Sequence, residues 1–249
     1  MRLVFATTFP EFFEDSCKVS IMGRAVGAGL IEFQALNIRN FATDSHKTTD
    51  DRPFGGGAGM LLKPEPVLKL IDSLNLPTGS RVVLTSPAGK TFTQEIAHEM
   101  SNAPAIAFIC GHYEGVDERI SEVCTDWLSI GDFVMTGGEF AALCMADAIT
   151  RLIPGVLGKE DSLNFESFSE GLLEYPQYTR PAELDDKVVP EVLRSGDHTR
   201  IAKWRREQAL RRTLLLRPEL LLDANLTKED KEILKTIVEQ MKSVTKDLF

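Results

Sequence analysis

Three glycine-rich segments of this 249-residue chain could hold a small ligand through their backbone. They are Leu84–Lys90 (LTSPAGK), Cys110–Arg119 (CGHYEGVDER) and Ser129–Glu139 (SIGDFVMTGGE). Glycine lets a backbone approach a ligand closely, so peptide groups can bind it without charged side chains. Loops at the carboxyl ends of parallel strands meet at one edge of a sheet, and we therefore expect these segments to converge on one site.

A fourth glycine-rich segment, Asp50–Gly59 (DDRPFGGGAG), carries an arginine and lies close in sequence to a histidine. It matches neither the phosphate loop of nucleoside triphosphatases nor the GxGxxG turn of dinucleotide-binding proteins, so neither class is indicated. We interpret it as a loop that faces RNA or phosphate, with a flexible turn as the alternative. The candidate contacts are His46, Arg52, Gly55, Gly56 and Gly57.

Basic residues are concentrated in one part of an acidic chain. The net charge at neutral pH is −9, yet residues 194–217 hold eight basic and two acidic residues, a local net of +6. A basic patch on an acidic body is typical of a local binding site for a polyanion. The alternative interpretation is a solvated helix face.

The four cysteines are Cys17, Cys110, Cys124 and Cys144, and none has the spacing of a zinc site. We expect reduced, mostly buried thiols and no metal centre. No stretch approaches 18 consecutive apolar residues, which excludes a transmembrane helix, and the first residues do not resemble a secretory signal. These features are typical of a cytoplasmic protein.

Apolar residues in the first two-thirds of the chain alternate between strand and helix patterns. This alternation predicts an α/β domain with a mostly parallel sheet. Strands are expected at residues 3–6, 31–36, 82–84 and 105–110. Helices are expected at residues 11–28, 64–74, 94–100 and 139–152.

A polar stretch without periodicity begins near residue 158, and strand signals disappear beyond it. The predicted parts are an α/β domain at residues 1–158, a linker at 159–173 and a small all-helical domain at 174–249. Within the last part, a basic helix at 198–212 has Ser195 or Asp197 as its N-cap. Thr227 and Asp230 resemble a capping box that opens a second helix.

Six segments occur in order along the chain: DDRPFGGGAGM, LTSPAGK, CGHYEGVDERI, SIGDFVMTGGE, RLIPGVLG and GLLEYPQYTRP. In this combination the chain resembles the TrmD family, the bacterial tRNA (guanine-N1)-methyltransferases, from Phe9 to beyond Trp204. The resemblance implies a SPOUT-type parallel sheet whose C-terminal part forms a deep trefoil knot, although general rules of chain connection argue against knots. It also implies an obligate homodimer, with the active site between the knot of one subunit and the C-terminal domain of the other.

The family transfers a methyl group from S-adenosylmethionine to N1 of guanosine-37 in tRNA, on the 3′ side of the anticodon. The resemblance therefore implies a methyl-donor pocket in the three converging loops. Its residues would be Leu84, Pro87, Gly111, Tyr113, Glu114, Ile130, Gly131, Phe133, Met135, Gly137 and Gly138. Ordinary core packing is the alternative for Tyr113 and Phe133. Family members are reported to need Mg²⁺, for which no ligand is legible in the sequence.

The reaction needs a base, because N1 of guanine carries a proton. In the family the base is the aspartate of an Asp-Ser-Phe sequence, where this chain has Glu166 before Ser167 and Phe168. The resemblance implies Glu166 as the base; the alternatives are Asp161, a water held by Glu166, or a merely solvated loop acid. Arg151 matches the family's catalytic arginine and would stabilise charge at O6, with a contact to helix-terminal carbonyls as its alternative.

The basic helix would then contact the phosphates of tRNA, and the target guanine would be flipped out of its stack. The candidate residues are Ser195, His198, Arg200, Lys203 and Arg206. Two competing interpretations remain, a SPOUT methyltransferase for another RNA and a non-catalytic RNA-binding relative. A nucleotide hydrolase is disfavoured, because the chain lacks the lysine pattern of a phosphate loop.

Overall fold

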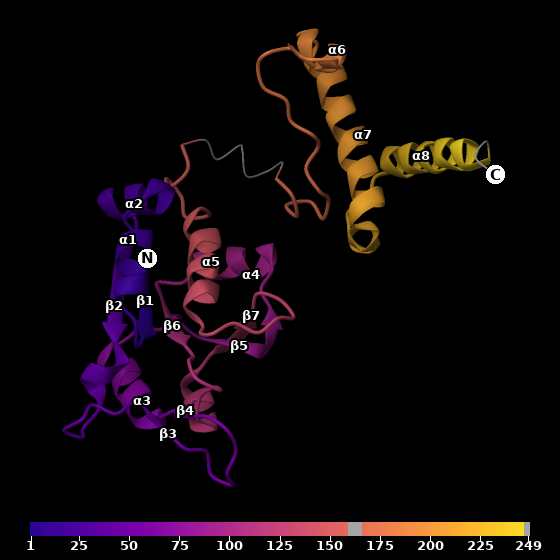
Figure 1. The fold of residues 1–249 in the computed structure, drawn as a ribbon. Helices are drawn as coiled ribbons and strands as arrows, with labels where there is room; N and C mark the ends of the chain where they lie inside the picture. Colours follow the sequence, from indigo (N-terminus) through magenta and orange to yellow (C-terminus); the bar gives the residue numbers. More distant parts are fainter. Residues whose placement is uncertain (159–165, 247–249) are drawn as a thin grey trace. The chain divides into compact units, whose positions relative to one another are not determined.

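The computed structural model describes the backbone of residues 1–158 and 166–246, with side chains through residue 242. The chain divides into two compact units, Met1–Gly158 and Lys159–Phe249, called the first and the second unit below (Figure 1). Over the described ranges, no helix combines the length and the apolar character needed to cross a membrane.

A five-stranded sheet with the order β2-β1-β6-β5-β7 lies at the centre of the first unit, and its neighbouring strands run parallel. The strands are β1 (Arg2–Thr7), β2 (Glu32–Asn37), β5 (Arg81–Thr91), β6 (Ala105–Cys110) and β7 (Asp126–Ser129). The predicted α/β fold with a mostly parallel sheet is confirmed, and all four predicted strands are present. Sequence reasoning misses β7, because four residues are too few to show a period.

Alternate residues of each strand pack into separate apolar layers on the two faces of the sheet, as the pleat requires. On one face the ring of Phe5 stacks on Phe13 at 4.2 Å and on Phe108 at 5.4 Å between centroids. On the other face Val4 and Ile109 join a buried cluster with residues of α3 (Pro64–Ser73). Because both faces are covered, the central strands β1 and β6 are almost continuously apolar.

The helices of the first unit lie close to their predicted positions, with one exception. Besides α3 they are α1 (Glu11–Ser16), α2 (Ser20–Gly27), α4 (Gln94–Ser101) and α5 (Glu139–Thr150), with 3-10 turns η1 (Ile38–Phe41) and η2 (Glu118–Val123). The prediction of one helix over residues 11–28 is wrong. The chain turns between α1 and α2, and the turn packs so closely that a Cβ at Gly23 would lie 2.2 Å from the carbonyl oxygen of Lys18.

Helix α5 is the most buried helix of this unit. It contacts β1 and β6 of the sheet as well as α2 and α4 (Figure 1). Its buried residues include Ala142, Met145 and Ile149, and Glu139 in its first turn is also buried. The buried carboxylate of Glu139 accepts a hydrogen bond from Thr7 Oγ1 at 2.8 Å, so the start of α5 is tied to the end of β1.

The second unit is mostly helical. Its elements are α6 (Glu191–Arg194), α7 (His198–Leu216), η4 (Pro218–Leu222) and α8 (Lys228–Lys246), with a hairpin of β8 (Glu183–Leu184) and β9 (Lys187–Val188). The hairpin departs from the predicted all-helical composition, because two-residue strands leave no pattern in a sequence. Of the two predicted N-caps of α7, Asp197 is the one that accepts a hydrogen bond from the backbone N–H of Arg200, at 3.0 Å.

Residues 166–173, expected in the linker, are folded against α7. The side chain of Leu172 is buried with Ala209 and Leu210. The backbone N–H of Leu173 donates to Oγ1 of Thr213, which is fully buried, at 2.9 Å. The folded part of the second unit therefore begins before the expected boundary at residue 174.

A buried carboxylate joins α7 to α8. The predicted capping box is confirmed, because the Thr227 N–H donates to Asp230 Oδ2 at 2.9 Å and the Asp230 N–H donates to Thr227 Oγ1 at 3.1 Å. The same carboxylate accepts Nε and Nη2 of Arg206, each at 2.9 Å. These donors, with the Arg206 guanidinium first, lower the pKa of Asp230 from 3.8 to about 2.

We expect Asp230→Asn to destabilise the second unit by about 2 kcal/mol at pH 7, the free energy of a pKa lowered by nearly two pH units. The ionised Asp230 carboxylate stabilises the folded unit fully above the pKa that this group has in the unfolded chain, near 4. This stabilisation is lost as the pH falls toward 2, the pKa in the folded state. The difference between the two proteins should therefore shrink over that pH range. Urea unfolding followed by Trp204 fluorescence in a Trp127→Phe background measures it, and equal stability at pH 7 would contradict the assignment.

Candidate functional site

One pocket of the first unit lies where the three glycine-rich segments meet, at the carboxyl ends of β6 and β7. The first segment, expected in a loop after a strand, lies within β5 and contributes residues 84–87 to the pocket. All eleven residues predicted to hold a methyl donor line this pocket, from Leu84 to Gly138. The pocket has ten further lining residues that the prediction omits, and all of them lie inside the same three segments or next to them. These are Thr85, Ser86, His112, Gly115, Val116, Leu128, Ser129, Val134, Thr136 and Ala141.

The loop after β7 is shaped by a glycine that a side chain could not replace. Gly131 has a φ of +150°, and a Cβ there would lie 2.7 Å from the ring of Phe133. Ser129 Oγ donates to the Gly131 carbonyl oxygen at 3.0 Å and accepts the Gly131 N–H at 3.2 Å. This turn leaves the Phe133 side chain on the pocket wall and 54% exposed, so core packing does not account for it.

Gly137 and Gly138 lie against both of the other loops. The Gly138 N–H donates to the carbonyl oxygen of Gly111 at 2.8 Å. A Cβ at Gly138 would lie 1.9 Å from Thr85 Oγ1, and one at Gly137 would lie 2.7 Å from His112 Nδ1. The chain that leads into α5 therefore lies against β5 and against the loop after β6, and only glycine leaves enough room for this approach.

The loop after β6 connects the pocket to the fourth glycine-rich segment, a link that sequence reasoning misses. The Met60 N–H donates to Glu114 Oε2 at 2.8 Å, and the Glu114 N–H donates to the Met60 carbonyl oxygen at 3.1 Å. A Cβ at Gly59 would lie 1.8 Å from the Glu114 carboxyl carbon. Glu114 thus lines the pocket and also holds the end of this segment.

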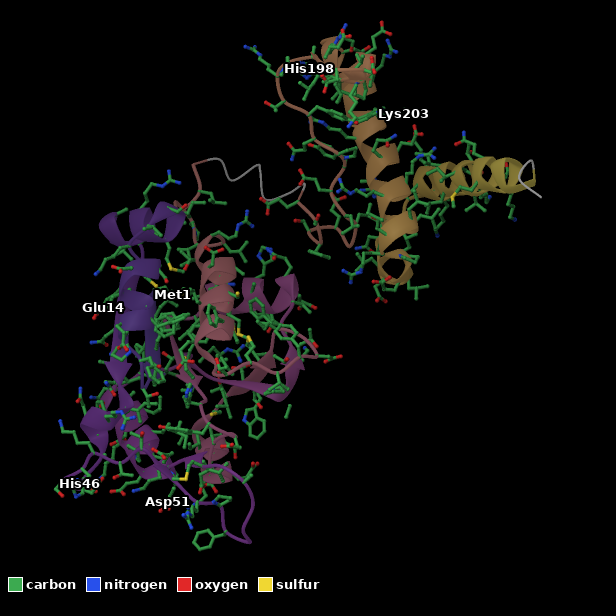
Figure 2. The ribbon with its side chains drawn as sticks, in the orientation of Figure 1. Met1, Glu14, His46, Asp51, His198 and Lys203 are labelled. Carbon is green, nitrogen blue, oxygen red and sulfur yellow. The ribbon has the colours of Figure 1, made fainter. Side chains whose placement is uncertain are left out.

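The predicted RNA contacts of the fourth segment are exposed around a short hairpin, β3 (Asp50–Asp51) with β4 (Leu61–Leu62). Gly55, Gly56 and Gly57 all have positive φ angles, of +84°, +79° and +133°. Figure 2 labels Asp51 on this hairpin and His46 on the loop before it. The structure leaves these residues accessible to a large ligand.

The composition of the pocket lining favours a ligand that is recognised by its shape and by hydrogen bonds with peptide groups. Among the residues that the structure describes, its lining includes the carboxylate of Glu114 and no lysine or arginine. Tyr113 has a left-handed φ of +63° and packs on the core cluster beneath the sheet edge while lining the pocket. Core packing and ligand contact therefore both apply to Tyr113.

The thiols of three cysteines are unsuited to nucleophilic catalysis. Burial raises the pKa of Cys17 to about 11, and burial followed by the charge of Asp126 does the same for Cys124. Burial, with a smaller effect of Glu139, raises the pKa of Cys110 well above its usual value. These thiols stay protonated at neutral pH, whereas a nucleophilic cysteine needs a thiolate.

The two predicted catalytic residues belong to different units. Arg151 is the C-cap of α5 in the first unit, and its backbone N–H donates to the Asp147 carbonyl oxygen at 3.2 Å. Glu166 lies in the second unit and lines a pocket there with Tyr175 and Arg205. The alternative base, Asp161, lies outside the described residues.

The predicted phosphate contacts at the start of α7 are exposed, with one correction. Ser195, His198 and Arg200 are exposed, and the Lys203 side chain is 70% exposed (Figure 2). Arg206 instead turns toward α8, where Asp230 takes two of its donors and Glu170 a third. Because its guanidinium is occupied within the protein, we withdraw Arg206 from the phosphate-binding set.

We expect Gly138→Ala to destabilise the first unit by about 2 kcal/mol, since the new methyl group overpacks the pocket wall, and to weaken binding of the predicted methyl donor, S-adenosylmethionine, at least tenfold. Thermal unfolding and calorimetric titration measure the two effects. Gly27→Ala is the matched control, because a Cβ there meets no atom within 4 Å. Donor binding by Gly138→Ala as tight as that of the control would contradict this account of the pocket.

Comparison with known proteins agrees with the resemblance. The family model described as "tRNA (Guanine-1)-methyltransferase TrmD" matches residues 1–223. A protein of Staphylococcus epidermidis named tRNA (guanine-N(1)-)-methyltransferase is 51% identical over 244 residues, covering 98% of this chain and 100% of its own. Proteins of the same name from Dictyoglomus turgidum and Halalkalibacterium halodurans are 48% and 49% identical, covering 97% and 96% of this chain and 98% and 99% of their own. The chain therefore belongs to the TrmD family of tRNA (guanine-1)-methyltransferases.

Proposed function

We propose that this chain transfers a methyl group from S-adenosylmethionine to N1 of guanosine-37 in tRNA. The observation that carries the proposal is the pocket of the first unit, where all eleven residues implied by the family resemblance come together. The family match over residues 1–223 and the names of the relatives support tRNA as the substrate and guanine N1 as the acceptor.

The pocket fits S-adenosylmethionine in its chemistry. Apolar side chains such as Leu84, Ile130 and Phe133 suit the faces of an adenine ring, and the peptide groups of the glycine loops suit its polar edge. The carboxylate of Glu114 suits the cationic part of the donor. When bound, S-adenosylmethionine supplies a methyl group on a positively charged sulfur.

The chain's own residues would handle the proton and the charge of the guanine. Glu166 accepts the N1 proton, and Arg151 stabilises the negative charge that develops at O6. Glutamate has one methylene more than the family's aspartate, so its backbone must lie about one carbon–carbon bond farther from N1. Over the described ranges, no cluster of three His, Cys, Asp or Glu side chains is placed to hold a metal ion, and we assign no ligand for Mg²⁺.

The finer architecture of the proposal follows the family. The first unit is a SPOUT domain with a deep trefoil knot, as the family resemblance implies. The C-terminal unit binds tRNA and presents Arg200 and Lys203 to phosphates. The chain acts as a homodimer, whose active site combines the knot of one subunit with the C-terminal unit of the other.

The decisive experiment is methyl transfer from S-adenosylmethionine to a tRNA transcript with G at position 37, followed by mass spectrometry of the product base. We expect N1-methylguanine at that position and no product when the G is replaced by A. Methylation of another base or of a ribose would support a SPOUT enzyme for a different target. Binding of donor and tRNA without any product would indicate a non-catalytic relative.

Glu166→Gln should lower kcat by at least a hundredfold at pH 7, because the amide cannot accept the N1 proton. Solvent removes this proton at high pH, so the deficit should shrink as the pH approaches the pKa of guanine N1. Glu183→Gln, an exposed acid on the hairpin of the same unit, is the control and should keep the unchanged rate. A wild-type rate for Glu166→Gln would show that another group is the base.

A further inference from the structure

The segment that carries Glu166 is wound into a tight loop by its own hydrogen bonds. The N–H of Ser169 donates to the Glu166 carbonyl oxygen at 3.2 Å, and that of Phe168 donates to the Leu172 carbonyl oxygen at 2.8 Å. Phe168 has a left-handed φ of +75°, which a bulky residue adopts only where its surroundings impose it. The loop therefore has one defined shape, and whatever holds it also sets the position of Glu166.

The far end of this loop is attached to α7. Leu172 is buried against Ala209 and Leu210, and the Leu173 N–H donates to Thr213 Oγ1 at 2.9 Å. At Gly171, a Cβ would lie 3.1 Å from Cα of Ala224, so the backbone of the loop also lies close to the chain between η4 and α8. These contacts hold residues 171–173, downstream of the loop's centre.

A single guanidinium holds the centre of the loop. Arg206 Nη1 donates to Glu170 Oε2 at 2.5 Å, while its Nε and Nη2 donate to the two oxygens of Asp230. The Asp230 side chain is only 3% exposed and is also fixed by the capping box of α8. Arg206 is therefore anchored by a buried carboxylate at one end and presents a fixed donor to the loop at the other.

The contact with Glu170 has little to do with stability. The Glu170 side chain is 58% exposed, and exposed ion pairs contribute little to the free energy of folding. Its geometric effect is larger, because Glu170 lies four residues after Glu166 in the same closed loop. A small misplacement of a catalytic group can cost a hundredfold in rate.

We infer that Arg206, held by Asp230, acts through Glu170 as a positioning residue for the Glu166 carboxylate. This inference rests on the proposed function of Glu166 as the base. The position of Arg206 on a basic helix suggests a contact with phosphate. The inference instead assigns Arg206 a role within the protein. The substituted base, a glutamate with an extra rotatable bond, makes a fixed loop more important.

Glu170→Ala tests the inference without disturbing the buried Arg206–Asp230 pair, so the unit should remain folded. We expect kcat for methyl transfer to fall at least tenfold at pH 7, with KM for tRNA and Kd for S-adenosylmethionine within twofold of their original values. Glu170→Gln keeps an acceptor for Arg206 and should show an intermediate rate. Gln240→Met is the matched control, because it removes the Arg211 hydrogen bond between α7 and α8 and leaves Glu170 and Arg206 unchanged.

The pH profile separates positioning from a merely structural effect. If Glu170 acts through the base, the loss of kcat in Glu170→Ala shrinks as the pH rises toward the pKa of guanine N1, as it does in Glu166→Gln. Glu166→Gln combined with Glu170→Ala should then be no slower than Glu166→Gln alone. A deficit equal at every pH, or a raised KM with an unchanged kcat, would overturn the inference.

The outcome also distinguishes this inference from the proposed function. A wild-type kcat for Glu170→Ala together with an inactive Glu166→Gln overturns the positioning role and leaves the base in place. A wild-type kcat for Glu166→Gln overturns the assignment of the base, and the positioning role with it.

Discussion

The close approach of the backbone at Gly138 is the constraint on which the pocket of the first unit depends. Its N–H donates to the Gly111 carbonyl oxygen, and its α-carbon lies so near Thr85 that no methyl group fits between them. The segment between β7 and α5 can therefore lie against β5 and against the loop after β6, and the three segments form one pocket. Since α5 begins at the next residue and is buried against β1 and β6, the same constraint also positions the helix that covers one face of the sheet.

The two units contain different chemistry. The pocket of the first unit is lined mainly by glycines, apolar side chains and small hydroxyl side chains, with the carboxylate of Glu114, which suits a small ligand recognised by shape and peptide groups. The second unit carries the basic helix α7, where Arg200 and Lys203 are exposed and Arg206 is neutralised by Asp230 and Glu170. Part of one helix thus carries exposed positive charge in a chain whose net charge is −9.

Features that depend on neighbours in the chain could be predicted from the sequence. Strand β6 occupies its predicted residues, and the capping box of Thr227 and Asp230 forms as its spacing indicates. The prediction for β5 covered three residues of eleven, because the strand continues past a register shift at Thr85 and Lys90 that arises from its pairing with β7. The predicted helix at residues 11–28 is interrupted by a turn that depends on close packing at Gly23.

By itself, the sequence determined the class of fold and the family, and it predicted eleven residues that line one pocket of the structure, because motif order and apolar periodicity are properties of the linear chain. Only the tertiary structure decided which residues hold these motifs together. The hydrogen bonds of Glu114 with Met60, of Thr213 with Leu173 and of Arg206 with Asp230 join residues 54, 40 and 24 positions apart. Such contacts leave no periodic trace in a single sequence, since their partners meet only after the chain has folded. Arg206 shows the consequence: its type and spacing indicate a phosphate contact, and its surroundings make it part of the protein's own framework.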